Sequence, residues 1–377
     1  MFLQDFKVIR PKFESSQESA LEWIAAAHVQ ARMKLNGWAK DSQECRDFAK
    51  GIREKLLSLG LGEKKIQKRS SQLPDFFHDN WEEMEIYNVA AIPEGYHLDK
   101  RMEFFSNAAM EVFEEMYPTG ARLPSHLVHV TCTGYVAPSP AQRLVSLRSG
   151  GKETMVTHAY HMGCYGSIPS IRMAMGHFSV EEKETDIVHT EFCTLHLNPS
   201  LHTTEQLVVQ SLFADGFIKY TLGDGNCEAP SLKILGISEE IIENSTSKMT
   251  WNCNPSSFQM TISKDIPVLL RNNLEGYLER LLKRAKRENW KGARFAIHPG
   301  GPKIIEQIAK KLELKPEQIR HSQEVLENCG NMSSATLPHV WDLLLKDPTV
   351  KKGELIVSLA FGPGLSICGG VFEKWRC

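Results

Sequence analysis

The sequence of 377 residues has no excess of charge of either sign, because 44 Lys and Arg residues face 46 Asp and Glu residues and leave a net charge of −2. A chain without an overall basic field has no general attraction for nucleic acid or for an anionic membrane surface, so we expect neither as its partner. The first residues also lack the basic and then apolar pattern of a secretory signal. These absences predict a cytoplasmic protein.

The chain has little that resembles a membrane span. Residues 355–372 carry no charged side chain, but Gly362, Pro363 and Gly364 interrupt this segment. A spanning helix tolerates such a cluster poorly, whereas a tight turn between two strands is built from these residue types. We therefore predict two buried strands here and no integral membrane segment.

Nine cysteines are present, but no two of them have the C-x-x-C spacing of a structural zinc site or a redox motif. Their odd number, in a long chain without an export signal, is typical of free thiols in a reducing compartment. We expect no disulfide framework and no metal.

Strands and helices alternate from residue 126 onward, whereas the first 120 residues read mainly as helix. The predicted helices include residues 19–32, 41–59, 98–116, 168–175, 268–288, 303–312 and 335–345, and the predicted strands include residues 126–132, 217–222, 294–297, 354–361 and 365–372. This alternation predicts a layered α/β fold. No linker rich in Gly and Ser separates the halves, so we expect residues 1–222 and 223–377 to share one interface.

Cys164 is the first candidate for chemistry. It lies between Gly163 and Gly166, directly before the predicted helix 168–175. The oriented N–H groups at a helix N-terminus stabilise a thiolate, and flanking glycines permit a sharp turn that presents the sulfur. The same pattern also fits a buried structural cysteine in a tight turn.

His298 and Asn331 each lie at a junction that leads into a predicted helix. His298 ends a strand before Pro299 and two glycines, and Asn331 follows Gly330. Taken singly, His298 fits a local turn and Asn331 fits a helix cap. Together with Cys164 they form a plausible nucleophile, base and oxyanion donor.

Several motifs make the chain resemble the type III polyketide synthases, the chalcone and stilbene synthase family. The matching segments are residues 130–134 (VTCTG), 163–166 (GCYG), 212–216 (LFADG), 298–302 (HPGGP), 330–335 (GNMSSA) and 361–364 (FGPG). Their order matches the family from about residue 120 to the C-terminus. Because several specific motifs recur in one order, the chain is identified as a member of this family, with more likeness to its bacterial members than to its plant members.

The resemblance implies a thiolase-like αβαβα fold of two similar halves, a homodimer, and repeated condensation of malonyl-CoA onto an acyl-CoA starter without a metal or redox cofactor. It implies that Cys164, in residues 1–222, is the acylated nucleophile. His298 and Asn331, in residues 223–377, would then hold the thiolate in an ion pair and stabilise the enolate formed by decarboxylation. The expected products are pyrones or resorcinols.

The resemblance also implies a substrate pocket, and its residues are Cys132, Thr133, Phe213, Met260, Ser334, Phe361, Gly362 and Pro363. Phe213 matches one of two aromatic residues at the pocket entrance, while Met260 replaces the other. Ala360 replaces a usual glycine, and Cys132 stands where plant enzymes often have Thr. These differences argue against a plant flavonoid or stilbene starter.

Three basic residues, Lys65, Lys68 and Arg69, are candidates for CoA phosphate contacts, although a solvated helix face explains them equally well. Two other functions stay open at this point. One is a single-condensation ketosynthase of fatty-acid type that uses carrier-protein substrates, and the other is a non-catalytic binding protein derived from the family.

Overall fold

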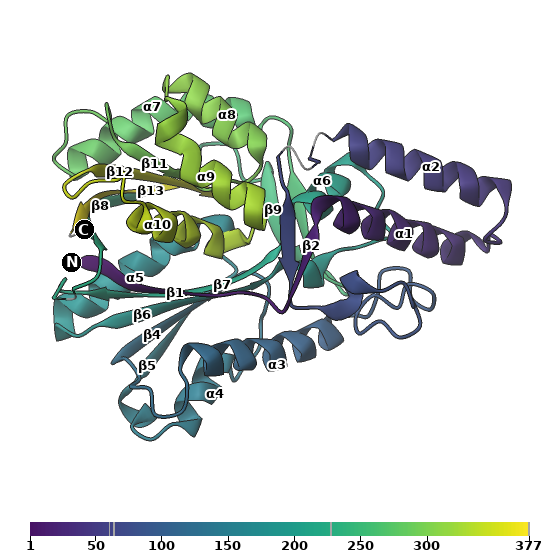
Figure 1. The fold of residues 1–377 in the computed structure, drawn as a ribbon, viewed down its shortest axis with the longest axis horizontal. Coiled ribbons are helices and arrows are strands. Elements are labelled where there is room, and N and C mark those ends of the chain that lie inside the picture. The colour runs from purple at the N-terminus through teal and green to yellow at the C-terminus, as the bar shows by residue number, and fades with distance from the viewer. Residues whose placement is uncertain (60, 63–64, 227, 376–377) are drawn as a thin grey trace.

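The computed structural model describes residues 1–59, 61–62, 65–226 and 228–375, and its centre is a nine-stranded sheet (Figure 1). One group of strands, in sheet order, is β5 (Met155–Tyr160), β4 (His126–Thr131), β6 (Thr185–Phe192), β7 (Asp215–Gly223) and β1 (Phe2–Ile9). The sheet continues with β8 (Ser231–Ile241), β13 (Ser366–Trp375), β12 (Leu355–Gly362) and β11 (Arg294–Ile297). The two groups meet where Phe2 and Leu3 of β1 pair with β8.

Helices form three layers around the two strand groups. Between the groups lie α5 (Ser167–Glu181) and α10 (Thr336–Lys346), and α5 contacts strands of both (Figure 1). The outer helices are α7 (Ile266–Arg284), α8 (Pro302–Lys311) and α9 (Pro316–Cys329) on one side, and α3 (Leu98–Met116) and α4 (Pro140–Leu147) on the other. This is the five-layered αβαβα arrangement that the motifs imply.

Both strand groups are covered on their two faces, which explains the sequence of their central strands. All residues of β4 and β6 are buried, and the two strands are parallel. Strands buried on both faces lack the alternating pattern of a half-exposed strand. These two strands also carry buried polar residues, such as His129 and Glu191, whose side chains form hydrogen bonds inside the core.

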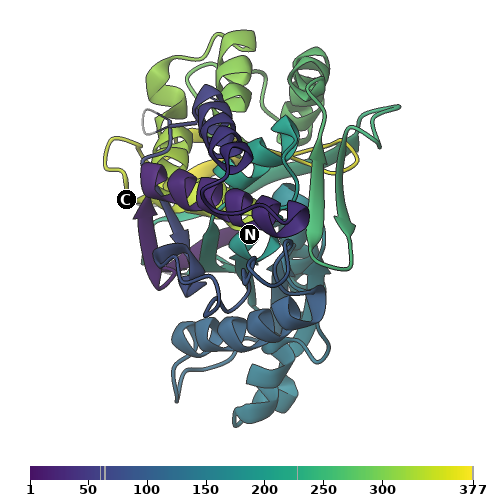
Figure 2. The same ribbon diagram turned by 90° about the vertical axis from the view of Figure 1, so that its right-hand side faces the viewer.

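Smaller elements lie beside this core. The helices α1 (Gln17–Asn36) and α2 (Gln43–Ser58) pack against each other and on α6 (Thr204–Leu212). Two short antiparallel pairs complete the fold: β2 (Phe13–Ser16) with β3 (Lys68–Ser71), and β9 (Met249–Cys253) with β10 (Phe258–Ile262). Figure 2 views the molecule from the side of α1 and α2, with the green β9–β10 hairpin to their right.

The structure confirms most of the predicted elements. Residues 98–116 are α3, residues 294–297 are β11, and the uncharged segment 355–372 forms the antiparallel pair β12–β13. Within the described ranges no helix is long and apolar enough to cross a membrane.

The prediction that the first 120 residues are mainly helical is wrong for β1, which lies inside the sheet between β7 and β8. Its pattern is disturbed at Asp5, where φ is +53° and the pairing register with β7 shifts. Such an irregularity breaks the period of two by which a strand is recognised. The strands β5 and β8 were also not predicted.

Candidate active site

A short turn, η3 (Gly163–Tyr165), places Cys164 between β5 and α5. Two glycines allow the 361–364 loop to pack closely against this turn. A Cβ atom on Gly163, where φ is +78°, would lie 2.4 Å from Pro363 Cδ, and one on Gly362 would lie 2.3 Å from the Tyr165 ring. The FGPG motif therefore supports the turn that carries Cys164.

Cys164 is buried, and the polar side chains of Ser333 and Asn331 lie near its sulfur. Burial disfavours the thiolate and raises the pKa of Cys164 to about 12, although these two polar side chains act in the opposite direction. In the protein without substrate, the thiol is therefore protonated at neutral pH.

His298 follows β11 and is held by a 2.7 Å hydrogen bond from its backbone N–H to the carbonyl of Leu359 in β12. Its side chain is buried, and neither ring nitrogen has a hydrogen-bond partner among the described residues. Burial lowers the pKa of His298 to about 3, so the imidazole is neutral. Burial thus favours an uncharged thiol and imidazole over an ion pair, and the unpartnered nitrogens leave the ring free to bind a substrate atom.

The Asn331 side chain lies near Cys164, and its orientation follows from its hydrogen bonds. Its Oδ1 accepts a 2.9 Å hydrogen bond from the backbone N–H of Ser333. The Nδ2 group is then the donor available to the Cys164 sulfur. The backbone of Asn331 also forms a parallel β-bridge with Phe213.

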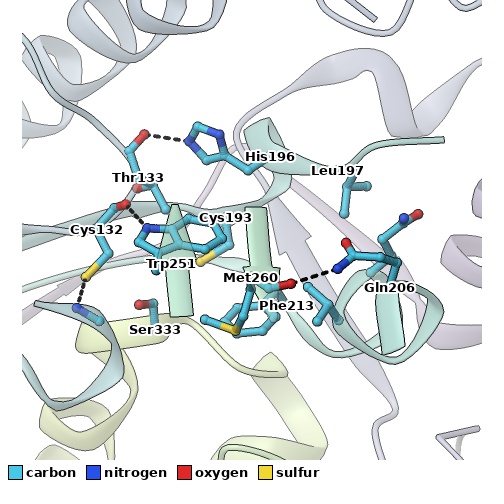
Figure 3. Close-up of a pocket in the computed structure, with 13 residues that line it drawn as sticks. Cys132, Thr133, Cys193, His196, Leu197, Gln206, Phe213, Trp251, Met260 and Ser333 are labelled. Carbon is cyan, nitrogen blue, oxygen red and sulfur yellow. Dashed lines mark hydrogen bonds between the residues drawn. The ribbon is translucent and has the colours of Figure 1, made fainter. Parts of the chain in front are cut away.

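A pocket of about 500 Å³, partly open to solvent, adjoins this cluster (Figure 3). It is lined by Cys132, Thr133, Gly163, Cys193, His196, Leu197, Gln206, Val209, Gln210, Phe213, Trp251, Met260 and Ser333. Four of the predicted pocket residues are in this lining, namely Cys132, Thr133, Phe213 and Met260. The other four are absent from it: Ser334, Phe361, Gly362 and Pro363.

Trp251 is a pocket residue that sequence reasoning missed. It lies opposite Met260 in the β9–β10 hairpin, and its indole N–H donates a 2.7 Å hydrogen bond to the carbonyl of Cys132 (Figure 3). The bond fixes the indole ring between the hairpin and the strand end that carries Cys132. Trp251 therefore forms part of the pocket wall. The sequence does not show this position, because it depends on the pairing of β9 with β10.

Glu191 is a second residue that was missed. This fully buried carboxylate accepts hydrogen bonds from the Cys132 N–H at 2.9 Å, from the Thr133 hydroxyl at 3.0 Å and from the Ser334 hydroxyl. Burial raises its pKa, while these donors lower it. Ser334 thus contacts Glu191 behind the pocket wall. No local signal in the sequence marks Glu191, because β6 carries several other polar residues as well.

The three basic residues proposed for CoA lie in different environments. Lys65 and Lys68 are exposed, and they form ion pairs with Glu306 at 2.6 Å and Glu14 at 2.8 Å. Arg69 is 5% exposed and bonded to backbone carbonyls, so it is not on a surface that a phosphate could reach. Only Lys65 and Lys68 fit the proposed CoA contact.

The described residues contain no group of three or more His, Cys, Asp or Glu side chains that could hold a metal ion. Seven cysteines in the described part of the chain are free thiols. The fold and the cluster of Cys164 and Asn331 next to a pocket define a thiolase-like protein with a buried cysteine.

Comparisons with known proteins agree with this class. Residues 234–374 match the family described as "Chalcone and stilbene synthases, C-terminal domain". "Probable polyketide synthase 1" of Dictyostelium discoideum is 29% identical over 253 residues, which are 65% of this chain. This chain spans 8% of the length of that relative. The C-terminal part of the chain, residues 234–374, thus matches the C-terminal domain of the chalcone and stilbene synthases, and the chain is similar in sequence to a polyketide synthase.

Solved structures share the fold along the whole chain. The C-terminal type III polyketide synthase domain of Steely1 from Dictyostelium has a TM-score of 0.81 at 22% identity, covering 99% of both chains. PKS-I of the brown alga Ectocarpus siliculosus has a TM-score of 0.82 at 20% identity, again covering 99% of both. Tetrahydroxynaphthalene synthase of Streptomyces coelicolor has a TM-score of 0.77 at 18% identity, covering 100% of both.

Proposed function

We propose that this chain is an acyltransferase that condenses malonyl-CoA units onto an acyl starter bound to Cys164. The observation that carries this proposal is the buried thiol of Cys164 near the Asn331 amide, in a protein whose buried His298 has no hydrogen-bond partner for either ring nitrogen among the described residues. A nucleophile with two neutral hydrogen-bonding groups suits chemistry at a thioester carbonyl.

In the first step the Cys164 sulfur attacks the thioester carbonyl of the acyl-CoA starter. The proton of the thiol passes to His298, and CoA leaves with a proton, so that a new thioester forms on Cys164. Because burial holds both side chains uncharged in the free protein, we propose that the ion pair forms only when the thioester is bound.

In the second step malonyl-CoA loses CO₂, and the electron pair of the broken C–C bond forms an enolate of acetyl-CoA. Hydrogen bonds from His298 and Asn331 would stabilise the enolate oxygen, a contribution that preorganised donors make in a site without bulk water. The enolate carbon then attacks the acyl group on Cys164, whose sulfur leaves. Neither step requires a metal or a redox cofactor.

The lining of the pocket supports an acyl chain as its occupant. Phe213, Trp251 and Met260 present apolar surface, and the unbranched side chain of Met260 adapts to different shapes. We propose that repeated extension in this space ends in cyclisation to a pyrone or a resorcinol, with Lys65 and Lys68 near the CoA phosphates.

The test is incubation of the protein with labelled malonyl-CoA and acyl-CoA starters of two to eighteen carbons, with products identified by mass spectrometry. We expect product from one window of chain length. Cys164→Ala abolishes acyl-enzyme and product, whereas His298→Gln and Asn331→Ala retain some acylation and lose most of the decarboxylation of malonyl-CoA. Normal product from Cys164→Ala would refute the assignment.

A ketosynthase supplied by a carrier protein is the second candidate. Its support is that one similar structure is a domain of "a Type I/III PKS Hybrid", and that the relative from Dictyostelium discoideum is far longer than this chain. Turnover of acyl groups on a carrier protein, without turnover of the CoA thioesters, would favour this candidate.

We further propose a cytoplasmic homodimer in which residues 1–222 supply Cys164 and residues 223–377 supply His298 and Asn331. The edge strand β5 supports the dimer, because among the described strands it pairs with β4 alone. Exposed apolar side chains lie at or near it: Met155 on β5 itself, and Tyr135, which contacts Tyr160 of β5. Two copies of β5 related by a twofold axis run antiparallel and could pair.

A further inference from the structure

The C-terminal end of α6 lies beside the active site, and every backbone carbonyl from residue 209 to residue 213 accepts a hydrogen bond. The donors are the Phe213 N–H for Val209, Arg69 Nη1 for both Gln210 and Phe213, Gln17 Nε2 for Ser211, and the Asn331 N–H for Leu212. The last carbonyls of a helix have no partner within the helix, so these donors determine how the chain leaves α6.

Arg69 is the one charged group among these donors. Its Nη1 lies 2.8 Å from the carbonyl of Gln210 and 2.9 Å from that of Phe213. Burial lowers the pKa of Arg69 to about 10, so the guanidinium stays charged at neutral pH. The negative end of the α6 dipole stabilises a cation at this place.

The same short segment holds the backbone of Asn331. The Asn331 N–H donates to the carbonyl of Leu212 at 2.9 Å, and the Ala214 N–H donates to the carbonyl of Asn331 at 2.9 Å. Phe213 lies between these two bonds and contributes its side chain to the pocket. A pocket residue and the residue whose amide lies near Cys164 therefore share one bridge.

Arg69 also packs directly against the loop that carries Asn331. A Cβ atom on Gly330, where φ is +70°, would lie 3.2 Å from Arg69 Cγ and 3.0 Å from the carbonyl oxygen of Leu212. Arg69 thus touches both sides of the bridge: it bonds to the carbonyls of Gln210 and Phe213, and its aliphatic stem contacts Gly330.

We propose that Arg69 is a positioning residue for decarboxylation, which holds Phe213 and Asn331 in place through their shared bridge. The inference rests on the proposed function only in naming decarboxylation as the reaction that a change at Arg69 slows. Without the two bonds from Nη1, the end of α6 moves relative to β3 and carries the Asn331 amide with it. Displacement of a catalytic group by about 1 Å costs roughly 100-fold in rate.

The test compares Arg69→Met, which keeps the stem and removes both donors, with Gln17→Met. Gln17 is a matched control, because it is buried and donates to the Ser211 carbonyl at the same end of α6, and among the described residues it has no hydrogen bond to Phe213 or Asn331. Arg69→Lys keeps the charge and one donor group, and it replaces Arg69→Met in every comparison if the latter does not fold. Thermal unfolding is recorded for each variant.

We expect Arg69→Met to lower kcat for malonyl-CoA decarboxylation by roughly 10- to 100-fold, with little change in KM. Acylation of Cys164 by starter changes less than decarboxylation, and Arg69→Lys restores part of the loss. Gln17→Met is less stable but keeps its decarboxylation rate per folded molecule. Equal losses in the Arg69 and Gln17 variants, or no loss in either, would overturn the proposal.

Alkylation of Cys164 by iodoacetamide provides a second readout that needs no malonyl-CoA. Because the Asn331 amide lies near the sulfur and favours its thiolate, Arg69→Met alters the alkylation rate of folded protein and Gln17→Met does not. A wild-type protein that never decarboxylates malonyl-CoA refutes the proposed function alone, and the alkylation comparison then decides whether Arg69 positions Asn331. Identical alkylation rates in the two variants would overturn the role of Arg69.

Discussion

Replacement of Trp251 by Ala is expected to lengthen the acyl starter that the protein accepts. A large aromatic side chain buries about 150–250 Å², and Trp251 is partly buried, so the lower value applies. A methylene group buries about 30 Å², since it contributes about 0.8 kcal/mol at about 25 cal/mol per Å². The space vacated by the indole ring therefore accommodates about five methylene groups.

The assay is kcat/KM over a series of acyl-CoA starters of increasing length. We expect the optimum to move by about four to five carbons, with a gain of about fourfold for each added methylene inside the new space. Trp251→Ala also loses the hydrogen bond to the Cys132 carbonyl, at a cost of about 1 kcal/mol in folding free energy.

Two further variants separate these effects. Trp251→Phe keeps most of the bulk without the N–H group, so its length optimum stays near that of the wild type. Trp290→Ala removes a partly buried indole outside the pocket and reports the effect of destabilisation alone. A folded Trp251→Ala protein with the wild-type length profile would show that the indole does not limit the pocket.

Two other predictions concern the thiol and the assembly. Because burial raises the pKa of Cys164 to about 12, its thiolate fraction at pH 7 is on the order of 10⁻⁵. The rate of iodoacetamide alkylation in the free protein should then rise about tenfold per pH unit from pH 7 to pH 10. A rate that stays level from pH 6 to pH 9 would mean that the ion pair with His298 already exists without substrate. For the dimer, Met155→Lys at the β5 edge should produce monomers in light scattering, because a charge opposes edge pairing. Leu57→Lys is the control, because Leu57 is an exposed residue of α2, a helix on the opposite side of the molecule from β5 (Figure 1). Unchanged dimers with Met155→Lys would exclude the β5 edge as the interface.

The sequence determined the class of fold, and its local features indicated which residues to propose for the chemistry. Alternating strands and helices, glycines beside Cys164 and His298, and the FGPG turn are each readable within a few residues, because backbone geometry and periodicity are local properties. Cys164 and Asn331, which the motifs single out 167 positions apart, lie near each other in the structure.

Only the tertiary structure decided which side chains complete the site. β1 enters the sheet although its pattern is irregular, because pairing with β7 and β8 satisfies its backbone. Trp251 becomes a pocket wall through its register opposite Met260, and Glu191 becomes the acceptor for Ser334 from a distant segment. Arg69, one of three neighbouring basic residues in the sequence, is buried against α6 while Lys65 and Lys68 remain exposed. Burial and long-range strand pairing depend on the whole fold. Burial distinguishes the buried cation Arg69 from the exposed lysines, and strand pairing places Trp251 in the pocket wall.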